Sequence, residues 1–350
     1  MRSRLSAHSG NLPPPEGKAP YPGPMPLIGD VGEDALIALF SPRLPTTISA
    51  LLGPGDDAAV LSLKGDLVVS SDVLVEDRHF RREWSTASDV GYRAAMQNLA
   101  DIDAMGAVPV ALQVTLAAPP STDVQWVLDF ADGLREACEP LGVGVIGGDI
   151  SGSREISVSV TALGETRGRT PVRRSGARVN NVVAVSGALG AAMAGYHQLE
   201  NHLRIDSESI DLFLRPQPRI GAGVEACDAR ATAMMDISDG LVTDLARLAL
   251  ASEIGIAIES ARVPIHPSVG RVAGQVVASP VDWALTGGED HHLLATFPAR
   301  ADLPGGWVAI GVVTRGHEGV EVDGKAPTLW GWDHFPRAEA TIASTTSERD

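Results

Sequence analysis

The sequence predicts an α/β or α+β protein, because strand-like and helix-like segments alternate along its 350 residues. Apolar residues make up 44% of the chain and charged residues 21%, which is ordinary for a globular protein. Only 4% of the residues are aromatic, so Val, Ile, Leu and Ala must fill the core. A basic and irregular stretch at 166–178 marks the expected boundary between two domains.

The first half of the chain predicts helices and strands in turn. Ser88 is a suitable N-cap for a helix that runs to Met105, and Ser121 or Thr122 for a second helix that reaches Cys138. A shorter helix is expected at 27–40. Strands rich in Val, Leu and Ile are expected at 57–63, 67–75, 142–146 and 156–164.

The second half continues the alternation. Helices are expected after Gly190, around 220–227, and from Ser238 or Asp239 to about Ala251. The pattern shows no repeat of solenoid or propeller length. Strands are expected at 182–185, 233–237, 254–258, 293–297 and 308–313.

Charge and composition limit the partners of the protein. A formal net charge of −16 disfavours nucleic acid and anionic membranes as partners. The cysteines, Cys138 and Cys227, are expected to be reduced thiols in a cytoplasmic protein. No apolar run has transmembrane length, and the Pro-rich residues 1–26 and the last residues, 341–350, are expected to be loose tails.

Aspartates recur beside Gly or Ser where an apolar strand or helix ends. One such aspartate is more typical of a turn or a cap. A set that converged would repel, and hard divalent cations are the usual compensation. The set therefore favours a multi-metal site for phosphoryl transfer. Its members are Asp56, Asp57, Asp72, Asp101, Asp149, Asp236 and Asp239.

Local context strengthens some of these candidates. Ser238 and Asp239 are expected at the start of a helix, where backbone N–H groups favour anions, although an N-cap worth about 1 kcal/mol explains them equally. Asp101 is expected near a helix C-terminus, where the dipole disfavours a carboxylate. A bound cation explains that position better than helix stability does.

Other motifs leave alternatives open. Arg173, Arg174 and Arg178 suit phosphate groups, or form a solvated linker. The glycines of 187–190 resemble a phosphate loop, but the Walker and protein-kinase motifs are absent. Glu289 either receives a polar or cationic substrate group or lies on a turn, while the adjacent His291-His292 pair is interpreted as structural.

An ordered set of motifs resembles the thiamine-monophosphate kinase family over nearly the whole chain. The motifs are GPGDDAAVL at 53–61, SSDVLVEDRHF at 70–80, NLADIDAMGAVP at 98–109, GGDISGS at 147–153, RSGAR at 174–178, MDISDGL at 235–241, LTGGEDHHLL at 285–294 and GWDHF at 331–335. The chain departs from the family at His291-His292, where Tyr-Glu is frequent, and at Ile150, where Thr is frequent.

The resemblance implies an aminoimidazole ribonucleotide synthetase-like architecture of two domains. Residues 27–165 would bind ATP and metal and would pair into a β-barrel in a homodimer, and residues 166–340 would complete the active site. The reaction would be ATP-dependent phosphorylation of thiamine monophosphate to thiamine diphosphate, the last step of thiamine diphosphate biosynthesis. ATP would be the co-substrate, with several Mg²⁺ ions at each site.

The resemblance also assigns roles to single residues. The metal-binding positions would be Asp57, Ser70, Ser71, Asp72, Asp101, Asp149, Asp236 and Asp239. Positions near the nucleotide would be Gly148, Asp149, Arg174 and Ser238, and positions that contact the substrate would be His79, Glu289 and Trp332. The aspartates expected to be catalytic are Asp57, Asp72, Asp101, Asp149 and Asp239.

The expected chemistry is direct in-line transfer without a phospho-enzyme. The acceptor phosphate is largely ionised at neutral pH, since its second pKa is about 6, and so needs no general base. Two alternatives stay open at this point. One is another ATP-dependent enzyme of the same superfamily, and the other is a non-catalytic protein whose aspartates bind divalent metal for stability.

Overall fold

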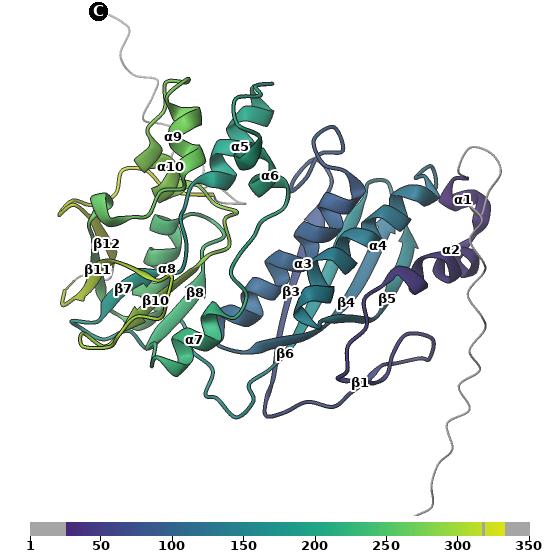
Figure 1. Cartoon of the computed structure of the whole chain (residues 1–350), viewed down its shortest axis with the longest axis horizontal. Coiled ribbons are helices and arrows are strands. Elements are labelled where there is room, and N and C mark those ends of the chain that lie inside the picture. Colours follow the sequence, from purple (N-terminus) through teal and green to yellow (C-terminus); the bar gives the residue numbers. More distant parts are fainter. Residues whose placement is uncertain (1–25, 317–318, 333–350) are drawn as a thin grey trace, which may run out of the picture.

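The computed structural model describes residues 26–316 and 319–332, and these residues form two separate sheets flanked by helices (Figure 1). The predicted α/β class is confirmed. The domain limits placed at 27–165 and 166–340 stay a prediction. The tails expected at 1–26 and 341–350 lie outside the described residues, apart from Pro26.

A four-stranded sheet forms the first half of the molecule. Its two central strands are antiparallel to each other, and only one of its three strand pairs, at one edge, is parallel. A small hairpin of β1 (Ala50–Leu52) and β2 (Val60–Leu61) precedes it. The strand order is β3 (Leu67–Val75), β6 (Ser157–Glu165), β4 (Val108–Ala118) and β5 (Gly144–Gly152).

Two long helices, α3 (Ala87–Ala104) and α4 (Val124–Cys138), pack over one face of this sheet. They approach closely because glycines lie at their contact. A Cβ atom on Gly91 would come within 2.1 Å of the Phe130 carbonyl oxygen, and one on Gly133 within 2.0 Å of the Ser88 oxygen. The short helices α1 (Ile28–Val31) and α2 (Glu33–Phe40) border the same core.

A six-stranded sheet forms the second half, and its strand pairs are antiparallel except for one pair at an edge. Its strand order is β12 (Gly319–Val322), β9 (Gly255–Ile258), β11 (Val308–Thr314), β7 (Val182–Val185), β10 (Leu293–Phe297) and β8 (Ala233–Asp236). Its helices are α5 (Ala191–Glu200), α6 (Ser207–Leu214), α7 (Ala222–Asp228), α8 (Leu241–Ser252), α9 (Pro267–Ala273) and α10 (Pro280–Thr286).

Helix α3 joins the two halves. Its Asp103 carboxylate accepts a hydrogen bond of 3.1 Å from the amide of Gly223 on α7, and α3 also contacts β8. The C-terminal turn of α3 therefore lies at the junction between the two sheets (Figure 1). Within the described ranges, no helix is long and apolar enough to cross a membrane.

Several predicted elements differ from the structure in ways that affect the site. Thr86, rather than Ser88, caps α3 by accepting a hydrogen bond from the Asp89 amide. Strand β5 runs to Gly152, so the Gly-Gly-Asp motif lies within a strand and not after one. Helix α8 starts at Leu241, so Ser238 and Asp239 precede its first turn.

Candidate active site

One group of acidic side chains lies where β3, α3 and β8 meet. Ser70, Asp72 and Leu74 lie on the same face of β3, and Leu74 packs in the core beneath α3. The Ser70 hydroxyl donates a 2.6 Å hydrogen bond to the Asp101 carboxylate in the last turn of α3. Asp236, the final residue of β8, is only 5% exposed and raises the pKa of both Asp72 and Asp101. We call Ser70, Asp72, Asp101 and Asp236, together with Glu289 and His291 described below, the junction group.

The carboxylates of the junction group are forced together at an energetic cost. Burial, followed by the negative charge of Asp236, raises the pKa of Asp101 to about 7, with Ser70 opposing the shift. Burial also raises the pKa of Asp72, and His291 partly offsets that rise. Without a cation Asp101 is therefore partly protonated near neutral pH, which supports the sequence-based argument that converging aspartates need compensation.

Close backbone contacts bring four further candidate residues together just after β8, and these are Ser238, Asp239, Glu289 and Trp332. A Cβ atom on Gly288 would come within 2.3 Å of the Ser238 carbonyl oxygen, so only glycine permits this approach. The amide of Glu289 donates to the same oxygen at 2.9 Å, and the amide of Trp332 donates to the Asp239 oxygen at 2.9 Å. The three motifs at 235–241, 285–294 and 331–335 therefore meet at one turn, although residues 333–335 lie outside the described part of the chain.

His291 lies beside Asp236 and does not lie on a strand as expected, while the structural role predicted for the His291-His292 pair stays a prediction. It precedes β10, has a φ of 53°, and its Nδ1 atom lies 3.4 Å from Asp236 Oδ2. Burial lowers the pKa of His291, but Asp236 and Glu289 outweigh that effect and raise the pKa to about 9. His292 is half-buried beside Gly187, and desolvation lowers its pKa to about 4, which fits a structural role.

Asp239 has a partner that sequence reasoning missed. Arg247 on α8 donates one hydrogen bond to Asp239 and another, of 2.7 Å, to the fully buried Asp244. Burial and the charge of Asp236 raise the pKa of Asp244 to about 7. Spacing within α8 puts Asp244 and Arg247 on one face, but their contact with Asp239 depends on the preceding turn.

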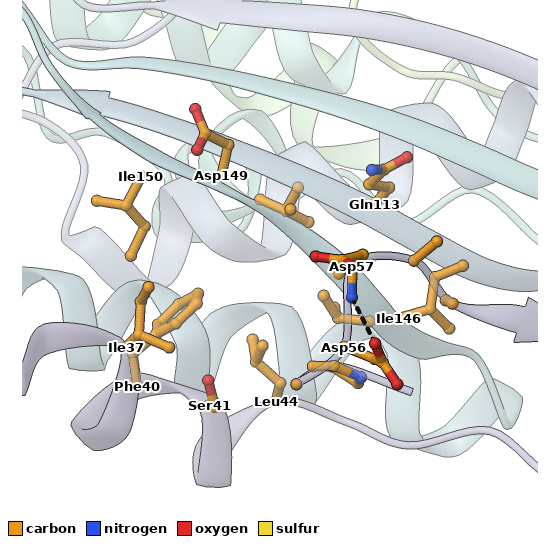
Figure 2. A pocket seen from close by; sticks show the side chains of 18 of the residues that line it. Ile37, Phe40, Ser41, Leu44, Asp56, Asp57, Gln113, Ile146, Asp149 and Ile150 are labelled. Carbon is orange, nitrogen blue, oxygen red and sulfur yellow. Dashed lines mark hydrogen bonds between the residues drawn. The ribbon is translucent and has the colours of Figure 1, made fainter. Parts of the chain in front are cut away.

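A second group lies at the opposite edge of the four-stranded sheet. Asp57, in the loop between β1 and β2, and Gly148 and Asp149, on β5, line a cleft of about 670 Å³ (Figure 2). Apolar side chains of α2, including Ile37 and Phe40, border the same cleft. These acidic residues are exposed, and we call Asp57, Gly148 and Asp149 the edge group.

The two groups do not meet within one chain. Strands β6 and β4 lie between β3 and β5, so the two edges are about 14 Å apart at ordinary strand spacing. Ser71 belongs to neither group, because it alternates with Ser70 and its hydroxyl donates to the Val160 carbonyl at 3.0 Å. Arg174 is exposed in the loop between β6 and β7. His79 lies just beyond β3, where its Nδ1 accepts from the Val75 amide at 3.0 Å.

Metal binding must be judged from the donor atoms. Among the described residues, no three His, Cys, Asp or Glu side chains are close enough to form a metal site by themselves. The donor atoms of the junction group are mainly carboxylate and hydroxyl oxygens, and burial together with the negative charge of Asp236 raises the pKa of Asp101. Such a set fits Mg²⁺, which commonly binds one or two carboxylates and completes its shell with water and substrate phosphates.

Family comparisons cover most of the chain. Residues 55–166 match the family model of the AIR synthase related protein, N-terminal domain, and residues 178–323 match that of its C-terminal domain. The thiamine-monophosphate kinase of Mycobacterium tuberculosis is 42% identical over 315 residues, covering 89% of this chain and 93% of that protein. The thiamine-monophosphate kinase of Corynebacterium glutamicum is 36% identical, with coverage of 89% and 95%.

Solved structures agree with the sequence relatives. A structure described as "AaThiL complexed with AMPPCP and TMP" has a TM-score of 0.74 and 36% identity, covering 87% of this chain and 98% of that one. A thiamine-monophosphate kinase from Stenotrophomonas maltophilia has a TM-score of 0.72 and 33% identity, with coverage of 84% and 96%. The resemblance and the two-domain fold predicted from the sequence are thereby confirmed, and this chain belongs to the thiamine-monophosphate kinase family.

Proposed function

We propose that this protein transfers the γ-phosphoryl group of ATP to thiamine monophosphate, giving thiamine diphosphate and ADP. Relatives named thiamine-monophosphate kinase match nearly their whole length, and one related structure holds AMPPCP and TMP. The observation that carries the proposal is the junction group, because it concentrates carboxylates beside the segment expected to contact substrate. This reaction is the last step of thiamine diphosphate biosynthesis.

The metal ions are the finer part of the proposal. Asp72, Asp101 and Asp236 would hold Mg²⁺ from the junction side, and Asp57 and Asp149 from the edge side, with Ser70, Ser71 and Asp239 as further positions. Bound Mg²⁺ would neutralise the phosphate oxygens and permit two anionic ligands to approach each other. This fits a strongly acidic protein that takes two phosphate-bearing substrates.

The other predicted residues would orient the substrates. Gly148, Ser238 and Arg174 would contact the nucleotide phosphates, through backbone N–H groups, a hydroxyl and a guanidinium. His79, Glu289 and Trp332 would contact thiamine monophosphate. The Trp332 side chain is exposed, and its aromatic face suits a cationic heteroaromatic ring. No general base is needed, since the acceptor phosphate is already ionised.

A homodimer is the expected assembly. The face of the four-stranded sheet away from α3 and α4 exposes apolar side chains of β3, and the β1–β2 hairpin exposes others. Exposed apolar patches of this kind favour an interface. The residues are Leu51, Leu52, Val60, Leu67, Val69 and Val73. A cytoplasmic location is proposed on the same grounds as from the sequence.

Product analysis tests the proposed function. The purified full chain is incubated with thiamine monophosphate, ATP and Mg²⁺, and the products are separated. Thiamine diphosphate and ADP are expected in equal amounts, with no phosphorylated protein. A parallel reaction with the substrate of an aminoimidazole ribonucleotide synthetase should give no ADP. ADP release only in that second reaction, or in neither, would contradict the proposal.

A further inference from the structure

Arg93 is a buried cation at the junction of the two sheets. It lies on α3, is only 3% exposed, and was not identified by any sequence motif. Burial lowers its pKa, and the charges of Glu289 and Asp89 oppose that effect. A guanidinium stays charged in proteins, so this buried charge must be compensated by specific partners.

The Arg93 guanidinium joins three segments that are distant in sequence. Its Nη1 atom donates a 2.8 Å hydrogen bond to the His79 carbonyl oxygen and lies 3.3 Å from the Glu289 Oε2 atom. Its Nη2 atom donates to the Phe213 carbonyl at the end of α6, and its Cζ atom lies 4.5 Å from the centre of the Phe213 ring. Only a planar, forked donor meets all these partners at once.

Two of these three segments carry residues that are expected to contact the substrate. His79 follows the edge strand of the first sheet, and Glu289 precedes β10 of the second sheet. The Glu289 side chain is 41% exposed, so it faces Arg93 on one side and open space on the other. Glu289 also has a φ of 71°, a conformation that needs support from its surroundings.

We propose that Arg93 is a positioning residue for thiamine monophosphate, which holds the His79 loop and the Glu289 carboxylate at a fixed distance across the domain junction. This inference rests on the proposed function. Arg93 fixes the orientation of a carboxylate that faces a cationic heteroaromatic substrate, and within the described ranges its hydrogen bonds and ion pair go to His79, Phe213 and Glu289, not to the residues expected to bind nucleotide. Loss of Arg93 therefore weakens substrate recognition more than ATP recognition.

Steady-state kinetics of Arg93→Lys and Arg93→Gln test the inference. For Arg93→Lys, KM for thiamine monophosphate should rise about tenfold, since one ammonium cannot serve both the carbonyls and the carboxylate. KM for ATP should stay within about twofold of wild type, a change worth only about 0.4 kcal/mol. Arg93→Gln should show the same split with a larger rise.

Arg215→Gln is a matched control. Arg215 also ties the end of α6 to α3, through a 2.6 Å bond to Asp89, and it pairs with Glu136 on α4. It contacts neither His79 nor Glu289 in any hydrogen bond or ion pair recorded among the described residues. Its loss should lower the melting temperature and leave both KM values unchanged.

The outcomes separate the two claims. A wild-type enzyme that does not phosphorylate thiamine monophosphate contradicts the proposed function itself. If the wild-type enzyme phosphorylates thiamine monophosphate, the positioning role is overturned by either of two results. Arg93→Lys could keep the wild-type KM for thiamine monophosphate, or it could raise the KM values for thiamine monophosphate and ATP by equal factors. If neither Arg93 variant yields folded protein, Arg93 is a structural residue and the inference is likewise overturned.

Discussion

The junction group and the edge group differ in how completely one chain builds them. In the junction group, Asp101, Asp236 and Glu289 each have a polar partner, which is Ser70, His291 and Arg93 respectively, and burial raises the pKa of Asp101 to about 7. In the edge group, Asp57 and Asp149 are exposed around an open cleft, and the strand order places Asp149 on β5 about 14 Å from β3. The comparison teaches that one chain fixes only part of the expected site, and we propose that ligands and a second copy complete it.

The largest expected effect comes from removing one charge in the junction group. Asp101→Asn should lower kcat by about a thousandfold or more, because a lost metal ligand removes charge stabilisation from the transition state. Initial rates at saturating ATP and Mg²⁺ measure this. Asp103→Asn is the control, because Asp103 lies on the same helix and its carboxylate accepts a hydrogen bond from the Gly223 amide. This substitution should lower the free energy of unfolding and leave kcat unchanged. Equal activity of Asp101→Asn and wild type would remove the junction group from the mechanism.

Mixing two inactive variants sharpens the comparison between the groups. If the edge group of one copy serves the junction group of its partner, Asp72→Asn and Asp149→Asn should complement each other. Random pairing then restores about a quarter of wild-type activity, because half of the dimers carry one intact site. Co-expression with two different affinity tags isolates the mixed dimers, which should then show about half of wild-type activity.

The control for complementation uses two changes within one group. Asp72→Asn mixed with Asp101→Asn should restore no activity, since every site then carries one defect. Restoration in this control, or its absence in the Asp72 and Asp149 mixture, would contradict a site shared between copies.

A smaller effect is expected at the aromatic end of the site. Trp332→Ala should raise KM for thiamine monophosphate about tenfold, the order expected for loss of a ring contact with a cation. Trp330→Ala is the matched control, because Trp330 lies two residues from Trp332 and is 56% exposed, against 59% for Trp332. An equal rise in both variants would show that the segment, and not the Trp332 ring, recognises the substrate.

The smallest expected effect is the change of the free energy of unfolding with pH. Asp101 has a folded pKa of about 7 against an ordinary 3.8, so the metal-free native state keeps a proton that the unfolded state has released. Its contribution to stability therefore falls as pH rises from 3.8 to about 7. Mg²⁺ should raise the melting temperature by more at pH 8 than at pH 5, and by several degrees at about 100 times Kd. An equal increment at both pH values would contradict this.

The local elements of the fold could largely be predicted from sequence. Strands β3, β7 and β10 were predicted with their correct limits, since each is a run of apolar and β-branched residues. Strand β4 was not predicted, because Pro109 was interpreted as a signal that ends the preceding helix. In the structure Pro109 lies at the start of this central strand, where the pairing register shifts. Helices α6, α9 and α10 are short and were missed as well.

The composition of the site could be predicted better than its arrangement. Aspartates beside Gly and Ser indicated metal binding, and the structure brings Asp72, Asp101 and Asp236 close enough to alter pKa values. The separation of Asp149 from them depends on the order of strands in the sheet, which local patterns do not encode. Arg93 and His291 act through contacts between distant segments, and no local spacing reveals such contacts.

Anomalous X-ray scattering from bound manganese tests the central claim most directly. Crystals of the full chain are grown with Mn²⁺, a non-hydrolysable ATP analogue and thiamine monophosphate, since Mn²⁺ takes the same oxygen ligands as Mg²⁺. The account predicts manganese peaks about 2.2 Å from carboxylate oxygens of Asp72, Asp101 and Asp236, with phosphate oxygens completing the shells. Manganese bound elsewhere, with these carboxylates coordinating nothing while both ligands are present, would contradict it.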